Sequence, residues 1–180
     1  MTPEPVLRVA TFADAVAIDE LMKASIRNIF PGSYDARQTA ASEQYIGSVD
    51  RTLIADGTYF VIDVNGELVA CGGWSRRDKL YTGSGDAAGD ARLLDAASEP
   101  ARVRAMFTRG GWTRRGLGRR ILEACEAAAK AEGFRTLALM STMPGMPLYE
   151  AYGFVVTEHV QIPMPDGTSI AGASMTKPID

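Results

Sequence analysis

The stretch Trp112–Glu123, written WTRRGLGRRILE, places two glycines and four arginines at the expected beginning of an amphipathic helix. The first N–H groups of a helix have no partner within the helix, and the macrodipole adds about half a positive charge there. Gly116 and Gly118 let a ligand approach the backbone closely. The positive charges come from Arg114, Arg115, Arg119 and Arg120. This combination predicts a phosphate or pyrophosphate site; a solvated basic helix start, with glycines that serve only the turn, is the alternative.

The residues around this stretch predict a strand that leads into a helix. Arg102–Thr108 alternates between two sets of side chains as a strand does, and Arg109–Gly111 then breaks the pattern. Gly133 is the expected end of the helix. One stripe of the helix is apolar and comprises Leu117, Ile121, Ala124, Cys125, Ala128 and Ala129. The glycine-rich turn therefore connects a strand to a helix with one buried face.

The rest of the chain predicts a mixed α/β fold. Asn65-Gly66 between two apolar runs indicates a tight β-hairpin. Arg76–Pro100 is rich in Gly, Ala and Asp and is expected to form an extended loop with at most one helical turn, and its role, including whether it covers a site, stays open. Further strands are predicted at Val6–Thr11, Tyr59–Val64, Glu67–Trp74, Arg135–Thr142, Phe154–Ile162 and Ser169–Thr176, and further helices from Asp14 to Ile29, Ala36 to Ser48 and Met146 to Tyr152.

Composition narrows the class of protein. The 180 residues are 46% hydrophobic and 23% charged, which predicts one domain, 1–180, with a proper core. A net charge of −3 argues against broad electrostatic binding to nucleic acid. Cys71 and Cys125 lie far apart and His159 is the single histidine, so no metal site is expected. The sequence shows no signal peptide and no apolar run of about 18 residues, so we expect a cytoplasmic protein with reduced thiols and no membrane partner.

Three common phosphate and hydrolase motifs do not fit. A Walker A loop would follow the Gly111–Gly116 spacing with Lys and Ser or Thr, but Leu117 and Gly118 stand there. A dinucleotide-binding fingerprint would require a third glycine where Ile121 stands. The hydrolase pattern G-x-S-x-G is absent, because Ser75 is followed by two arginines.

The chain resembles the GNAT acetyltransferase superfamily. The family's strand, glycine loop, long helix, second strand and short helix correspond here to ARVRAMFT, TRRGLG, RRILEACEAAAKAEG, FRTLALMST and PLYEAYGF. The resemblance is strongest over Ala101–Phe154, and the loop followed by LYEAYGF is its most specific part. It implies a GNAT-like fold with a central mixed, mostly antiparallel sheet of about six to seven strands flanked by helices. It also implies an acetyl-CoA-dependent N-acetyltransferase.

The resemblance assigns roles to particular residues. Backbone N–H groups of Arg114–Arg119 would hold the pyrophosphate of coenzyme A. The resemblance implies two groups of cofactor-binding residues. Those that would contact the pantetheine arm and thioester are Met106, Phe107 and Thr108. Those that would make the outer contacts with the cofactor are Thr113, Arg114, Arg115, Gly116, Leu117, Gly118, Arg119 and Thr142. Thr113, Thr142 and Gly145 depart from the residues most common in the family. Tyr149 would protonate the departing thiolate, because a phenol with a pKa near 10 and a thiol with a pKa near 8.5 are nearly matched.

The acceptor side is less defined by the sequence. The expected acceptor is a primary amine of a small molecule or a peptide, contacted by Phe30, Tyr34, Trp74 and Tyr81, although ordinary packing of these aromatics is an alternative. The general base is open between His159 and water. The sequence also leaves open whether the protein forms a homodimer. The alternative function is a catalytically silent domain that binds acetyl-CoA as a sensed ligand.

Overall fold

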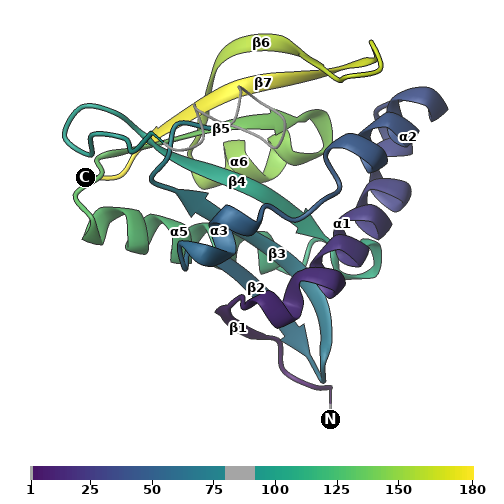
Figure 1. Cartoon of the computed structure of the whole chain (residues 1–180), viewed down its shortest axis with the longest axis horizontal. Coiled ribbons are helices and arrows are strands. Elements are labelled where there is room, and N and C mark those ends of the chain that lie inside the picture. Colours follow the sequence, from purple (N-terminus) through teal and green to yellow (C-terminus); the bar gives the residue numbers. More distant parts are fainter. Residues whose placement is uncertain (1, 80–91) are drawn as a thin grey trace.

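The computed structural model describes residues 2–79 and 92–180 and contains, within them, one seven-stranded sheet in the order β1-β2-β3-β4-β5-β7-β6 (Figure 1). All neighbouring strands are antiparallel except β4 and β5, which are parallel. The mixed, mostly antiparallel sheet expected from the sequence is therefore confirmed. The strands are β1 (Val6–Val9), β2 (Tyr59–Val64), β3 (Glu67–Ser75), β4 (Ala101–Thr108), β5 (Thr136–Thr142), β6 (Val155–Pro163) and β7 (Ser169–Pro178).

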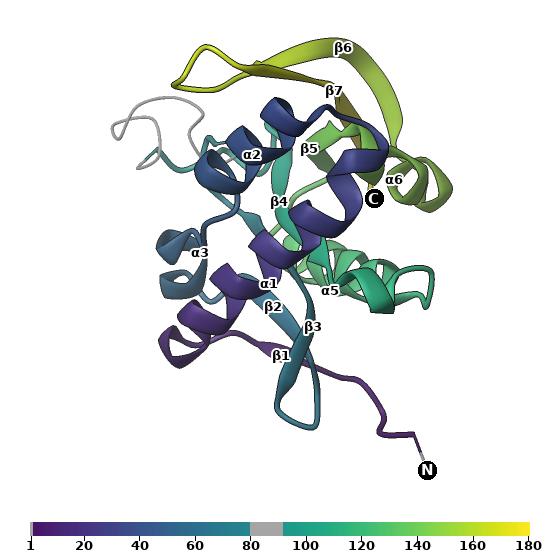
Figure 2. The same cartoon turned by 90° about the vertical axis from the view of Figure 1, so that its right-hand side faces the viewer.

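Helices cover both faces of the sheet. They are α1 (Ala15–Ile29), α2 (Ala36–Tyr45), α3 (Arg51–Ala55), α5 (Leu117–Ala131) and α6 (Met146–Tyr152). Figure 2 shows α2 and α3 on one side of the strands and α5 and α6 on the other. The alternation of side chains along β2 explains the two layers, because Val61 packs in the cluster of α1 whereas Ile62 packs in the cluster of α5. In the described residues, no helix combines the length and the apolar character needed to cross a membrane.

Several local predictions are confirmed by the backbone. Asn65 and Gly66 have φ values of 54° and 86°, as the tight hairpin between β2 and β3 requires. Gly133, with φ of 93°, follows the end of α5. The helix predicted to reach Ser48 ends at Tyr45, and α3 was not predicted. A five-residue helix is too short to show a periodic pattern, although the side chain of Asp50 caps it by accepting a hydrogen bond from Thr52 N.

The central strands β4 and β5 separate after a short contact. Their pairing is confined to Ala101 with Leu137 and Arg102 with Ala138. Beyond these pairs, the rest of β4 bonds to β3 and the rest of β5 bonds to β7. The sheet is consequently open between the two strands toward their carboxyl ends.

A β-bulge shapes the edge of this opening. Between the pairs Cys71–Phe107 and Gly73–Arg104, β4 has two residues where β3 has one. One of the two, Ala105, has a φ of 54°, which is unusual for a residue with a side chain. The buried Tyr59 hydroxyl donates a hydrogen bond of 2.6 Å to the Ala105 carbonyl oxygen. Tyr59 thereby holds the bulge from the neighbouring strand β2.

Candidate active site

A pocket of about 670 Å³ lies at the opening between β4 and β5. This volume is within the range of small-molecule sites. Its walls come from β4, β5, the beginning of α5, α6, the end of α1 and Ile162 of β6. The strand pair that diverges thus creates the space, and helices from both layers line it.

The beginning of α5 forms one end of the pocket. Its N-cap, Gly116, has a φ of 78°, which favours glycine, and no side chain among the described residues caps the helix. Arg120 N donates to Gly116 O at 3.1 Å. The N–H groups of residues 117–119 come before that first bond and have no intrahelical partner. This end of the pocket is suited to bind an anion, as the sequence predicts.

The arginines of this loop have different positions. Arg114 and Arg119 line the pocket, but Arg115 does not, and its guanidinium lies 4.6 Å from the centre of the Trp112 ring. Arg119 lies over the Tyr152 ring at 5.3 Å and contacts Glu123 at 3.2 Å. Of the cofactor residues named from the sequence, all except Arg115 line the pocket.

Gly118 has a packing role that the sequence did not reveal. A Cβ atom at this position would lie 2.7 Å from Cδ2 of Leu148 on α6. The missing side chain lets α5 and α6 approach each other, in addition to leaving the backbone accessible. Gly116 is different, because its Cβ would meet no atom within 4 Å and its positive φ is the constraint.

The backbone of β4 faces the opening at alternate residues. Arg109 N donates to Val69 O of β3 at 2.9 Å, so the polar groups of Met106 and Thr108 point to the other side, toward β5. Ser25 Oγ on α1 donates to the Thr108 carbonyl at 2.8 Å. The backbone of Met106 and the N–H of Thr108 can therefore bind an extended ligand in the opening.

Tyr149 of α6 lines the pocket and is otherwise buried, with 8% of its surface exposed. Its ring packs edge-to-face on Phe154 at a centroid distance of 5.8 Å. Gly145 makes room for the ring, because a Cβ there would lie 2.9 Å from Tyr149 Cε2. Burial raises the pKa of Tyr149 above its usual value, so the phenol keeps its proton at neutral pH. Thr142, at the end of β5, lines the same pocket.

The residues expected on the acceptor side are only partly brought together. Phe30 lines the pocket. Tyr34 does not, because its hydroxyl donates to Ala171 O at 2.6 Å and accepts from Met143 N at 2.8 Å, which joins the α1–α2 turn to β7 and the end of β5. Trp74 is 1% exposed and packs on Phe134 in the core, so the structure corrects its assignment to the acceptor side. Tyr81 lies outside the described residues.

His159, one of the two options for the general base, is exposed on the edge strand β6 and does not line the pocket. Several other lining residues carry no pattern in the sequence that marks them, although those of β4 and β5 lie within the segments ARVRAMFT and FRTLALMST. They are Ser25, Ile29, Ile46, Val103, Arg104, Ala105, Leu139, Met140 and Ile162. Only the separation of β4 and β5 shows that they share one site.

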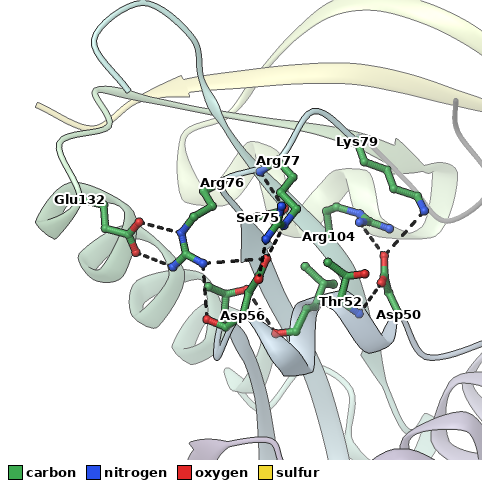
Figure 3. A network of polar contacts seen from close by, with 11 residues as sticks. Asp50, Thr52, Asp56, Ser75, Arg76, Arg77, Lys79, Arg104 and Glu132 are labelled. Atoms are coloured by element: carbon green, nitrogen blue, oxygen red, sulfur yellow. Dashed lines mark hydrogen bonds and ion pairs between the residues drawn. The ribbon is translucent and has the colours of Figure 1, made fainter. Parts of the chain in front are cut away.

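A buried ion pair stands beside the pocket (Figure 3). Arg104, which lines the pocket, is 2% exposed in its side chain and donates from Nη1 to Asp50 Oδ2 at 2.8 Å. Lys79 Nζ lies 3.9 Å from the same oxygen. Burial acts to raise the pKa of Asp50, but the charge and hydrogen bond of Arg104, the charge of Lys79 and the hydrogen bond from Thr52 N together outweigh it, and the pKa is lowered overall. Arg76 and Arg77 belong to a neighbouring set of contacts with Asp56 and Glu132.

Comparisons with known proteins agree with this geometry. No curated protein sequence matches the chain. Among solved structures, a GCN5-related N-acetyltransferase from Rhodopseudomonas palustris has a TM-score of 0.74 and 17% identity, with 99% of this chain and 98% of that one covered. The PaiA N-acetyltransferase from Thermoplasma acidophilum, in complex with coenzyme A, has a TM-score of 0.69 and 14% identity, covering 97% and 99%.

The ribosomal-protein-S18-alanine N-acetyltransferase from Escherichia coli has a TM-score of 0.61 and 16% identity, covering 98% of this chain and 95% of that one. At these identities the structures show a shared fold. The sequence model of the Acetyltransferase (GNAT) family matches residues 22–154, which include β4, the glycine loop, α5, β5 and α6. The chain therefore belongs to the GNAT family of acetyltransferases.

Proposed function

We propose that this protein transfers an acetyl group from acetyl-CoA to a primary amine of a small molecule or a peptide. The observation that carries the proposal is one continuous pocket, which joins the uncapped N-terminus of α5 to the opening between β4 and β5 and to Tyr149. Acetyl-CoA requires a site that binds its phosphates, a strand edge that binds its pantetheine arm and an acid that protonates its leaving thiolate. The anion-binding end, the exposed edge of β4 and the phenol of Tyr149 supply these three parts. A PaiA neighbour described in complex with coenzyme A supports the choice of ligand.

The residues fit coenzyme A along its length. The N–H groups at residues 117–119, with Arg114 and Arg119, would bind the pyrophosphate. The backbone of Met106 and the N–H of Thr108 would bind the pantetheine arm as an added strand does, through amide hydrogen bonds. Acetyl-CoA supplies an activated acetyl group and a thiolate leaving group when it is bound.

Tyr149 is the proton donor in this proposal. Its raised pKa makes the phenol a weaker acid than free tyrosine, so the near match of reference pKa values does not apply directly. Burial acts in the same direction on a thiol, as it does for Cys71, whose pKa is raised to about 12. A thiolate in the same apolar pocket would have its conjugate acid shifted in the same direction, which keeps proton transfer from Tyr149 available to this proposal.

Calorimetry and a thiol-release assay test the proposal together. We expect acetyl-CoA to bind and a panel of primary amines to release coenzyme A from it. Binding of acetyl-CoA without turnover across peptide, aliphatic and aromatic amines would overturn the transferase and favour the sensed-ligand alternative. Absence of binding would reject both functions.

A further inference from the structure

Resting on the proposed function, we propose that the acceptor is a hydrophobic monoamine: a primary amine with an apolar carbon skeleton and no second positive charge. The inference comes from the half of the pocket that lies across the sheet from α5. It specifies the substrate class that this chain selects within the general reaction.

The pocket has two halves that belong to different layers. Met106, Leu148 and Tyr149 lie in, or pack against, the core cluster of α5. The other half belongs to the cluster that α1, α2, β6 and β7 form on the opposite face. Its lining residues, here called the acceptor wall, are Phe30, Ile46, Phe107, Met140 and Ile162. A thioester that lies along β4 on the α5 side fills the first half of the pocket. The acceptor wall is then the part of the pocket that remains for the amine.

The acceptor wall is apolar in every member, and nearby polar groups have partners of their own. Ser25 Oγ is bonded to Thr108 O, and the Tyr34 hydroxyl is bonded to both Ala171 and Met143. These groups fix the main chain around the pocket. A hydrocarbon chain placed against this wall loses contact with water and gains contact with side chains.

The charges that line the pocket have one sign. Among the described residues, they are Arg104, Arg114 and Arg119. A second ammonium group on the acceptor would lose its hydration against the apolar wall. Among the described residues, no lining carboxylate would pair with it, because Asp50 lies outside the lining and is already bonded to Arg104 at 2.8 Å. The same environment favours the neutral form of the attacking amine. A monoamine with an apolar chain fits both conditions, and a polyamine fits neither.

The matched pair n-hexylamine and cadaverine isolates this chemistry, because the two molecules have the same number of non-hydrogen atoms and differ by a terminal methyl or ammonium group. Burial of each methylene changes affinity about fourfold. With the added cost of desolvating the ammonium group, we expect kcat/KM for n-hexylamine to exceed that for cadaverine at least about tenfold. The series from n-propylamine to n-hexylamine is expected to rise with each carbon.

Met140→Gln tests the wall itself, since glutamine has nearly the shape of methionine but adds an amide. We expect this variant to lower the preference for n-hexylamine about fivefold or more, with acetyl-CoA affinity unchanged. Val155→Thr is the matched control: Val155 is 60% exposed on β6 and lies outside the pocket, so the preference should stay as in the wild type.

Binding distinguishes failure of this inference from failure of the proposed function. Both amines are titrated by calorimetry into the protein saturated with coenzyme A, so the result does not depend on turnover. Tighter binding of n-hexylamine supports the acceptor wall even if the transferase is overturned. Equal or tighter binding of cadaverine, or Met140→Gln with an unchanged preference, would overturn the inference while acetyl transfer to other amines stands.

Discussion

At the scale of single residues, Tyr149 has the chemical role that is most open to a direct test. Tyr149→Phe keeps the ring against Phe154 and removes the proton. We expect acetyl-CoA affinity to change little and turnover to fall about 10² to 10⁴-fold, as for loss of a general acid. Thiol formation in the pre-steady state is the measurement, because product release can limit the steady state.

The neighbouring Tyr152 provides the control for this substitution. Tyr152 lies on the same helix, its hydroxyl donates to Glu126 at 3.2 Å, and it is not part of the pocket wall. Tyr152→Phe should leave turnover near the wild-type rate. If Tyr149→Phe also turned over at that rate while folded, Tyr149 would have no part in the proton transfer.

Gly145 controls where the phenol lies. Gly145→Ala places a Cβ 2.9 Å from Tyr149 Cε2 and 3.2 Å from Ser141 Oγ, in a backbone conformation that alanine accepts. We expect the ring to move and turnover to fall, by less than in Tyr149→Phe, at a stability cost of about 1–3 kcal/mol. Gly111→Ala, which meets no atom within 4 Å, is the comparison. Equal turnover in the two variants would show that the position of the ring is not critical.

At the scale of elements, a hydrogen bond from Tyr59 supports the bulge of β4. Tyr59→Phe leaves the Ala105 carbonyl without the hydroxyl that it accepts from. We expect a loss of about 1–3 kcal/mol in the free energy of unfolding, together with weaker binding of acetyl-CoA because Met106 is the second residue of the bulge. Urea denaturation and calorimetry measure the two effects.

Tyr45→Phe serves as the matched variant for Tyr59→Phe, since Tyr45 lies on α2 and outside the pocket. It should change acetyl-CoA affinity little. A Tyr59→Phe protein that is less stable but binds acetyl-CoA normally would mean that the hydrogen bond supports the fold and not the position of β4.

At the scale of the whole molecule, carboxylates paired with arginines make the free energy of unfolding depend on pH. The pKa of Asp14 is lowered to about 2 by its hydrogen bonds and charge contact with Arg8, and the pKa of Asp50 is lowered beside Arg104. A group whose pKa is lower in the folded protein stabilises the fold above its unfolded value, near 3.9, and loses that effect as the pH falls.

We therefore expect the free energy of unfolding, measured in urea, to fall as the pH is lowered from about 4 toward 2. The decrease should be smaller in Asp50→Asn, which will already be less stable at neutral pH, because it removes a carboxylate from the buried Arg104. Glu43→Gln, which removes the partner of the exposed Arg27, is the control and should change stability by about 0–1 kcal/mol. A free energy of unfolding that stays constant below pH 4 would contradict the assignment of these ion pairs.

The sequence by itself determined the parts of this protein that depend on local chemistry. Asn65-Gly66 specifies its hairpin because it accepts positive φ, and Gly116 followed by the apolar stripe of α5 specifies a helix with an accessible N-terminus. The spacing from that loop to LYEAYGF indicated the family, and the family match includes both. These features need no information about distant residues.

The tertiary structure alone decided how the site is assembled. Residue type did not distinguish Phe30, in the pocket, from Tyr34 and Trp74, whose positions depend on hydrogen bonds and packing with distant segments. The acceptor wall joins Ile46 and Ile162, which lie far apart in the chain and share one hydrophobic cluster and one pocket in the fold. The separation of β4 and β5 arises because β4 pairs with β3 and β5 pairs with β7 along most of their lengths, and these pairings join segments that no tight turn connects.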